Sequence, residues 1–224
     1  MQKETYNTVR AFFRDARPGK LLDIPAGKCW LRDVLGPGWE YHPADLYADP
    51  GVPGLVRADL NKPLPYDDAS FDYVACLEGI EHVENTHHIL REFHRVLRPG
   101  GTLVISTPNI LNTKNRYRFC WTGTYYGFPH IIRTPEEGTH LHINPINLSF
   151  LIAFARKAGF SLGRVHDLKP KASAYRFIFT SLYFKCFSFL KHISKDAETR
   201  ELAARLTSLN ILLNDGIVVS FRKS

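Results

Sequence analysis

The chain has 224 residues, 44% of them hydrophobic and 23% charged, with a formal net charge of +7, which is typical of a soluble globular domain with a basic surface. Lysine and arginine form no dense run, so nucleic acid is not favoured as a partner, and an anionic substrate or membrane stays open. No apolar stretch is long enough to span a membrane, no signal peptide is visible, and four scattered cysteines indicate a reducing, cytoplasmic compartment rather than a disulfide or zinc framework.

Strand-like segments alternate with helix-sized gaps through the first half of the chain. A leading helix is expected near 8–16, and an amphipathic helix over 84–97 that ends before Pro99. The expected strands are 21–24, 40–44, 54–58, 71–77 and 102–107. This alternation predicts a parallel sheet with right-handed crossovers.

The second half of the chain is less regular. Residues 110–144 are rich in Asn, Gly, Pro and aromatic side chains, which is typical of a lid or a binding loop. A helix is expected over 147–158 and strands over 161–167 and 217–222, separated by a helical, aromatic insertion, 174–214. We expect one domain, 1–224, with a cofactor-binding half at 18–109 and a substrate-side half at 145–224.

The first strand runs into a turn of small residues, KLLDIPAG at 20–27, and the second strand ends at an acid. Asp45 follows Asp23 by 22 residues. Small residues let a ligand approach the backbone closely, and a carboxylate at the end of the next strand accepts hydrogen bonds from both ribose hydroxyls. This layout predicts an adenosyl-binding site.

A more specific pattern lies in FDYVACLEGIEHV at 71–83 and LREFHRVLRPGGTLVISTPN at 90–109. With these pieces in order, residues 18–167 resemble the class I S-adenosylmethionine-dependent methyltransferases. The likeness is to ubiquinone-type O-methyltransferases and to methyltransferases of bacterial surface-polysaccharide clusters. It implies an α/β fold, a Rossmann-like, seven-stranded, mostly parallel sheet with helices on both faces. The last strand would be antiparallel and lie beside the fifth.

The resemblance also implies roles near the first two strands, with S-adenosylmethionine as the cofactor. Gly27 would let the backbone approach the methionine part, Asp23 would orient the loop, and Asp45 would bind the ribose. The usual loop has glycines at three alternating positions, whereas this chain has Pro25, Gly27 and Cys29 there.

Three further positions are implied to contact the cofactor. Asp59 follows the third expected strand and would accept a hydrogen bond from the adenine amino group, with Leu60 beside the ring. Leu77 ends the fourth expected strand, where the backbone would line the methyl-donor pocket.

Candidate catalytic residues are histidines, which suit proton transfer near neutral pH. His82 ends the run Glu78-x-x-Glu81-His82, whose three side chains would share one face of a helix and could bind a divalent cation, as the matching run in ubiquinone-type relatives is implied to do. We favour instead that Glu81 and His82 cap and brace the following helix and that Glu78 pairs with an arginine, with no metal bound. The lid-like segment adds three more histidines, of which we prefer the last as the base: His130, His140 and His142.

Residues 175–193 are too aromatic for an ordinary exposed helix, and Arg176 and Lys185 interrupt them. One interpretation is that these aromatic side chains pack on the sheet or form a homodimer contact. The other is peripheral membrane contact, which would suit a lipid-linked acceptor.

The sequence therefore predicts methyl transfer from S-adenosylmethionine to an oxygen of a small molecule, a saccharide or a lipid-linked glycan. Two alternatives stay open. The first is a non-catalytic S-adenosylmethionine-binding module, motivated by Pro25 and Cys29. The second is a nicotinamide-dependent oxidoreductase, which shares the same early layout of strands and helices.

Overall fold

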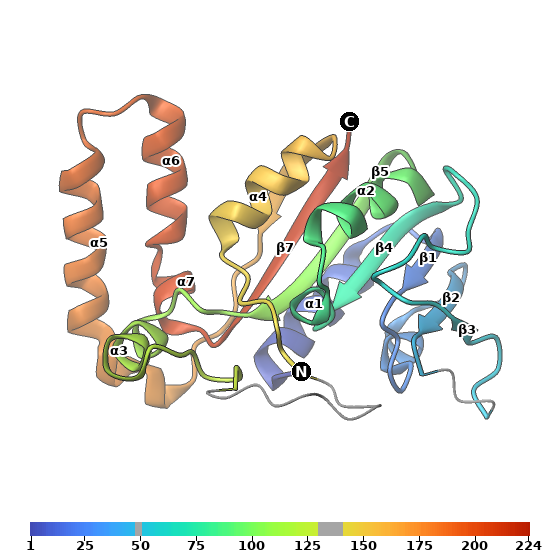
Figure 1. Cartoon of the computed structure of the whole chain (residues 1–224), viewed down its shortest axis with the longest axis horizontal. Coiled ribbons are helices and arrows are strands. Elements are labelled where there is room, and N and C mark those ends of the chain that lie inside the picture. The colour runs from blue at the N-terminus through green and yellow to red at the C-terminus, as the bar shows by residue number, and fades with distance from the viewer. Residues whose placement is uncertain (48–50, 130–140) are drawn as a thin grey trace.

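The computed structural model describes residues 1–47, 51–129 and 141–224, and within these ranges seven strands form a single sheet (Figure 1). The strand order is β3-β2-β1-β4-β5-β7-β6. The pairs among β1 to β5 are parallel, and β7 is antiparallel to β5 and β6. The strands are β1 Lys20–Asp23, β2 Glu40–Asp45, β3 Val56–Arg57, β4 Phe71–Leu77, β5 Leu97–Pro108, β6 Phe160–Val165 and β7 Gly216–Lys223. The predicted α/β class and the antiparallel last strand beside the fifth are confirmed.

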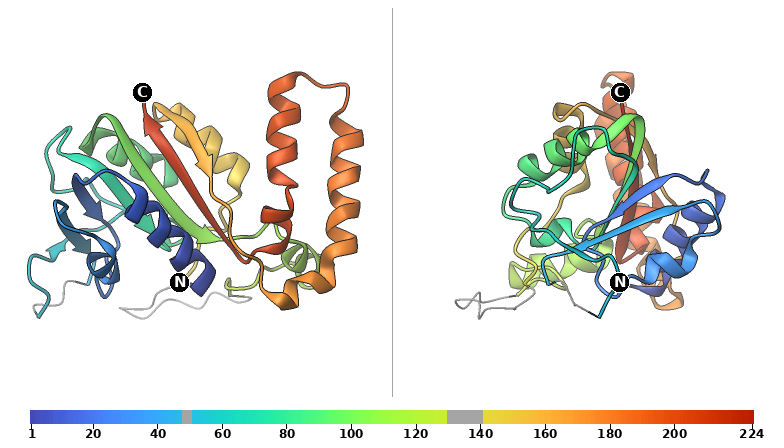
Figure 2. Two further views of the ribbon diagram at one scale, coloured as in Figure 1. Left: turned by 180° about the vertical axis from the view of Figure 1, so that it is seen from behind. Right: turned by 90° about the vertical axis from the view of Figure 1, so that its right-hand side faces the viewer.

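Helices lie on both faces of the sheet, and a helical hairpin stands at its β6 end (Figures 1 and 2). One face carries α1, and the other carries α2 and α4. The hairpin consists of α5 and α6. The α-helices are α1 Lys3–Asp15, α2 Thr86–Val96, α3 Thr113–Thr122, α4 Leu148–Lys157, α5 Ile178–His192, α6 Ala197–Leu206 and α7 Leu209–Leu213, and the 3₁₀ turns are η1 Trp30–Val34, η2 Ile80–His82 and η3 Ala172–Phe177.

Two apolar clusters hold the helices to the sheet. Val9 and Phe13, one turn apart on α1, are buried against Leu21 of β1. On the opposite face, Ile89 and Phe93 of α2 are fully buried in the larger cluster. Each fully buried side chain of this size contributes about 1.5–3 kcal/mol to folding, so the sheet is fixed from both sides and its carboxyl edge is a rigid platform.

Two segments differ from expectation. The Pro99-Gly100-Gly101 stop lies within β5, which begins at Leu97 directly after α2, and the register shifts between Phe71 and Tyr73 opposite this segment. Gly100 has φ +75°, a backbone conformation that glycine adopts without strain. The sequence signal for a turn therefore marks an irregularity inside a strand.

Part of the segment 110–144, expected to be irregular, is the helix α3. The Asn112 side chain accepts a hydrogen bond from Asn115 N–H at its start, and Gly123 with φ +66° ends it.

His130 and His140 lie outside the described residues. Across the described ranges, no helix is both long and apolar enough to cross a bilayer.

Candidate functional site

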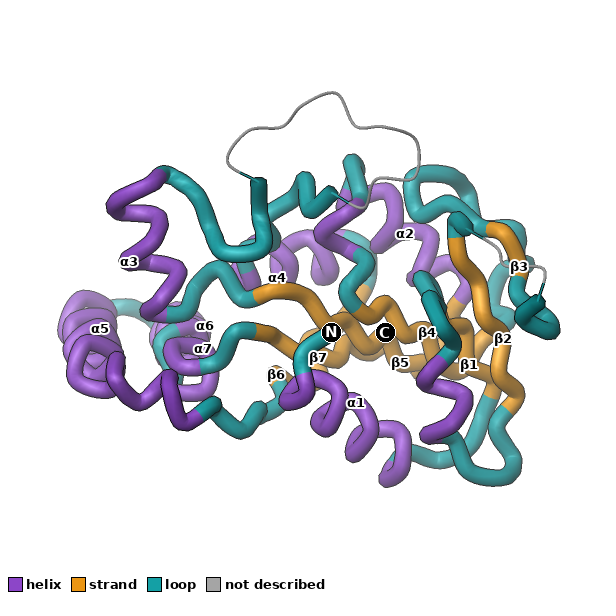
Figure 3. Tube along the Cα trace, turned by 90° about the horizontal axis from the view of Figure 1, so that it is seen from below, coloured by secondary structure: helices purple, strands orange, loops and turns teal. Residues whose placement is uncertain are grey.

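A cavity of about 300 Å³ opens at the carboxyl ends of β1, β2 and β4, the edge that faces the viewer in Figure 3. In open α/β sheets ligands bind at this edge. The cavity brings together residues that lie far apart in the sequence, from Met1 to Val83. Those among its lining that the sequence singled out are Pro25, Gly27, Asp45, Asp59, Leu60, Leu77, Glu78 and His82.

Asp45 lies at the wall of the cavity and is held by two backbone donors. Gly27 N–H donates to its Oδ2 at 2.9 Å, and Tyr47 N–H donates to its Oδ1 at 3.0 Å. A carboxylate has about four acceptor sites, so each oxygen keeps capacity for a ribose hydroxyl. Gly27 has φ +51°, and nothing lies within 4 Å of where a Cβ would be, so its backbone borders open space.

Asp23 lies behind this wall rather than in it. It is buried, and its Oδ2 accepts a hydrogen bond from Tyr41 Oη at 2.6 Å. Burial raises the pKa of Asp23 to about 7, the hydrogen bond from Tyr41 opposes this, and the charge of Asp45 adds to it. Its position is that of a brace between β1 and β2, next to the loop it was expected to orient.

Pro25 and Gly79 form a close contact on another side of the cavity. A Cβ on Gly79 would overlap Pro25 Cδ and would lie 3.1 Å from Cys76 Sγ. Both residues line the cavity. Sequence reasoning missed Gly79, because only the fold brings the turn after β4 against Pro25. Cys29, the other departure from the glycine pattern, is buried with φ +55° and is not among the lining residues.

Beside the cavity lie Glu81, His82 and His142. The Glu81 side chain is fully buried; its Oε2 accepts a hydrogen bond from Thr107 Oγ1 at 3.1 Å, and its Oε1 lies 4.0 Å from His142 Nε2. The rings of His82 and His142 are 4.7 Å apart. His82 Nδ1 is 2.8 Å from the carbonyl oxygen of Leu141, so Nδ1 donates and a neutral ring carries its lone pair on Nε2. Of the two histidines, His82 lines the cavity.

The electrostatics of this group favour uncharged side chains. Burial raises the pKa of Glu81 to about 8, and the charge of Glu78 adds to the rise. Burial lowers the pKa of His142, as does the charge of His82. A neutral imidazole at neutral pH is a proton acceptor, which is what a general base requires.

Glu78 does not join this group. Its φ is +53°, and its Oε1 accepts a hydrogen bond from Ser106 Oγ at 3.0 Å. The three residues of the Glu78-x-x-Glu81-His82 run were expected to share one helical face, but only residues 80–82 form a 3₁₀ turn. The cap of the next helix is Asn85, whose side chain accepts from His88 N–H at 3.0 Å, and not Glu81 or His82.

The metal implied by the family would meet a suitable donor set here, with His142 in place of Glu78. Ligand atoms of Glu81, His82 and His142 all lie within 4.8 Å of one another. Within the described part of the chain, Glu81 Oε1 is buried without a hydrogen-bond partner. Ligands about 2.1 Å from one ion are at most about 4.2 Å apart, so the side chains would have to close by a few tenths of an ångström.

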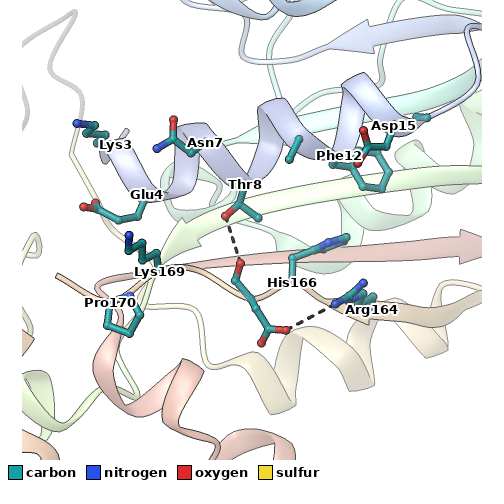
Figure 4. A pocket seen from close by; sticks show the side chains of 13 residues that line it. Lys3, Glu4, Asn7, Thr8, Phe12, Asp15, Arg164, His166, Lys169 and Pro170 are labelled. Atoms are coloured by element: carbon teal, nitrogen blue, oxygen red, sulfur yellow. Dashed lines mark hydrogen bonds and ion pairs between the residues drawn. The ribbon is translucent and has the colours of Figure 1, made fainter. Parts of the chain in front are cut away.

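A larger cavity of about 970 Å³ lies between α1 and the segment after β6 (Figure 4). Some of its polar groups are paired with one another. Thr8 Oγ1 donates to the carbonyl oxygen of Asp167 at 3.3 Å, and Arg164 lies 3.6 Å from the Asp167 carboxylate. None of the residues that the sequence singled out lines it, so size alone does not make it the functional site.

Known methyltransferases are similar to parts of this chain. A profile described as a methyltransferase domain matches residues 42–105. The chain is similar to the ubiquinone biosynthesis O-methyltransferase of Pseudomonas syringae pv. tomato, with 35% identity over 108 residues, which is 48% of this chain and 43% of the relative. The chain thus spans about two fifths of the length of the curated relatives it matches.

Solved structures share the fold over nearly the whole chain. One is the S-adenosylmethionine dependent methyltransferase from Mesorhizobium loti, with TM-score 0.54, 16% identity and 98% of each chain covered. Another is the 1,6-didemethyltoxoflavin-N1-methyltransferase of Burkholderia thailandensis with bound S-adenosylhomocysteine, with TM-score 0.57, 14% identity, and 99% of this chain and 79% of that chain covered. At these identities the likeness concerns the fold.

Proposed function

We propose that this chain transfers the methyl group of S-adenosylmethionine to a hydroxyl oxygen of its acceptor, because a methyltransferase-domain profile matches residues 42–105 and the chain shares its fold with an S-adenosylmethionine dependent methyltransferase. The observation that carries the proposal is the cavity at the carboxyl edge of the sheet. Its lining includes both an acid suited to the ribose, Asp45, and an imidazole, His82. A neighbouring imidazole, His142, adds a second proton acceptor.

The cofactor would occupy the cavity along its polar wall. Asp45 would accept hydrogen bonds from the ribose hydroxyls, and Asp59 one from the adenine amino group beside Leu60. Leu77 and Gly79 would border the sulfonium end. S-adenosylmethionine is already an activated donor, so the protein's task is to align the acceptor oxygen with the methyl group and to exclude water.

A hydroxyl acceptor must lose a proton as the bond to the methyl carbon forms. His82 borders the cavity and His142 packs against its ring, so this pair is placed to receive that proton. If a divalent cation were held by Glu81 and the two histidines, it would lower the pKa of a bound hydroxyl. The effect of EDTA on turnover separates the two routes, because only the second depends on a cation.

The acceptor class rests on the likeness to ubiquinone biosynthesis O-methyltransferases. We propose a small phenol or alcohol, a saccharide or a lipid-linked glycan, with the cytoplasmic side as the place of reaction. The test is transfer of radiolabel from methyl-labelled S-adenosylmethionine to a panel of these acceptors. Product with a new methyl ether supports the proposal, and methylation restricted to nitrogen or carbon acceptors contradicts it.

A binding module without turnover is the second candidate, because Pro25 takes the place of a loop glycine and lines the cavity. Proline has no N–H to offer a ligand. Calorimetry with S-adenosylhomocysteine tests this alternative together with the acceptor panel. Binding with no product from any acceptor supports the module, and a thermal shift with NAD in place of S-adenosylhomocysteine would favour an oxidoreductase over both.

A further inference from the structure

Helix α5 presents its apolar side chains to the outside of the molecule. Within the described structure its side chains form an exposed face whose members are 41–83% exposed. We call this set the outer face of α5: Phe179, Leu182, Tyr183, Phe187, Phe189, Leu190 and Ile193. Contiguous exposed apolar surface of this kind marks a docking site.

The helix has the reverse of the usual amphipathic arrangement. At about 100° per residue, the outer face of α5 occupies an arc of about 160°. The opposite side carries Ser181, which is buried and bonded to Thr113 Oγ1 at 2.7 Å, and Ser188. A helix whose apolar face serves the protein core would be turned the other way. The outer face of α5 therefore serves contact with something else.

Within the segment 169–195 that carries this face, the charged side chains all have one sign, and the next acid along the chain, Asp196, caps the start of α6. Lys185 and Lys191 lie on the two borders of the apolar arc, and the stretch 169–195 contains no Asp or Glu. Helix α3 packs beside α5, through Tyr117 Oη and Thr180 Oγ1 at 3.1 Å, and it too contains cations and no acid. The outer face of α5 is thus apolar at its centre and basic at its rim.

We propose that the outer face of α5 binds an anionic lipid bilayer, with the helix lying in the headgroup region. Aromatic side chains in the middle and lysines at the border are what an interfacial helix needs: the rings enter the acyl boundary and the ammonium groups remain among the phosphates. A second copy of this chain is a poorer occupant, because a two-fold contact would bring the same basic rims together.

Bilayer binding would favour a methyl acceptor that is itself held at a membrane. This part of the proposal rests on methyl transfer being the function. Helix α3 and the start of α5 lie at the edge of the sheet on which the cavity opens (Figures 1 and 3). An acceptor anchored in the same bilayer would need to extend only along this edge. Docking itself requires neither cofactor nor acceptor, so the two proposals fail separately.

The experiment is flotation of the full chain with phosphatidylcholine vesicles, with and without one third phosphatidylglycerol. We expect binding to the anionic vesicles alone. Phe179→Ser with Phe187→Ser should weaken it at least about tenfold, because both rings are exposed and apolar. Lys185→Gln with Lys191→Gln should weaken it about twenty-five-fold, at about fivefold for each lysine.

Matched controls come from α4, which lies away from this face (Figure 1). Phe150 is 62% exposed and Lys157 is exposed, so Phe150→Ser and Lys157→Gln make the same chemical changes elsewhere and should leave vesicle binding intact. Equal binding to neutral vesicles, or equal losses in the controls, would overturn the proposal. So would the absence of vesicle binding together with a dimer that the double Phe179/Phe187 variant converts to monomer.

Discussion

Glu81 Oε1 lies 4.0 Å from Nε2 of His142, with the glutamate side chain fully buried and the imidazole partly exposed. Burial raises the pKa of Glu81 and lowers that of His142. Each group is thereby shifted toward its neutral form, and an attractive ion pair would form only where Glu81 has lost its proton and His142 has gained one. The arrangement is that of an imidazole ready to accept a proton with an acid behind it.

His142→Ala should lower kcat by about 10²–10⁴ if this imidazole takes the acceptor's proton. The Kd for S-adenosylhomocysteine should stay the same, because His142 does not line the cavity. Steady-state kinetics and calorimetry on the same preparation measure the two quantities. Wild-type turnover in the variant would remove His142 from the chemistry.

His82→Ala should behave differently, since this ring does line the cavity. We expect both a loss of turnover and a weaker Kd for the cofactor product. Combining it with His142→Ala should cost less than the sum of the separate losses, because residues in contact are coupled. Fully additive losses would mean that the two rings act independently.

Asp45→Ala should weaken binding of S-adenosylhomocysteine by about 1–3 kcal/mol, through loss of charge-assisted hydrogen bonds to the ribose. The backbone donors of Gly27 and Tyr47 would lose their acceptor as well. Titration calorimetry gives the Kd, and Asp33→Ala, an exposed acid outside the cavity, is the control. An unchanged Kd in the first variant would take Asp45 out of the site.

Stability should depend on pH through Asp23, whose pKa is raised to about 7 in the folded protein. Between about pH 4 and pH 7 the folded state holds a proton that the unfolded state has released, so the stability contributed by the protonated acid is lost as pH rises through this range. Asp23→Asn should lack this loss. From pH 4 to pH 8, its free energy of unfolding relative to that of the wild type should therefore rise by about 2–4 kcal/mol.

Urea denaturation at several pH values measures this difference. Asp33→Asn is again the control, and its stability should follow that of the wild type throughout. Parallel curves for Asp23→Asn and the wild type would show that Asp23 ionises in the folded state without cost.

Gly79→Ala should destabilise the fold by about 1–3 kcal/mol, because the added Cβ would overlap the ring of Pro25. Gly36→Ala is the matched change, since nothing lies within 4 Å of its Cβ position and its φ is not positive. Thermal unfolding of the two variants compares them directly. Equal midpoints would mean that the Pro25 loop moves aside freely.

Much of the fold could be predicted because the parallel strands are short apolar runs between helices of clear period. The fourth expected strand, 71–77, has the bounds that the structure gives β4. The bulge at Pro99–Gly101 and the helix α3 were missed for a local reason: glycine and proline signal a turn equally well at a strand irregularity, and α3 has a polar sequence whose caps, Asn112 and Gly123, hold it.

The site residues that could be predicted are those at or just after the carboxyl ends of strands. Asp45, Asp59 and Leu77 each end or follow a strand and meet at one cavity. Gly79 against Pro25 and Glu81 against His142 could not be predicted, because each contact joins segments that only the folded chain brings together. The roles assigned to these residues stay predictions.

The most direct test of the account is the crystal structure of the chain with S-adenosylhomocysteine. We predict the ribose hydroxyls within hydrogen-bonding distance of the Asp45 carboxylate, the adenine beside Leu60, and the sulfur directed toward His82. A ligand bound elsewhere, or a cavity into which the product cannot be introduced at millimolar concentration, would contradict the central claim.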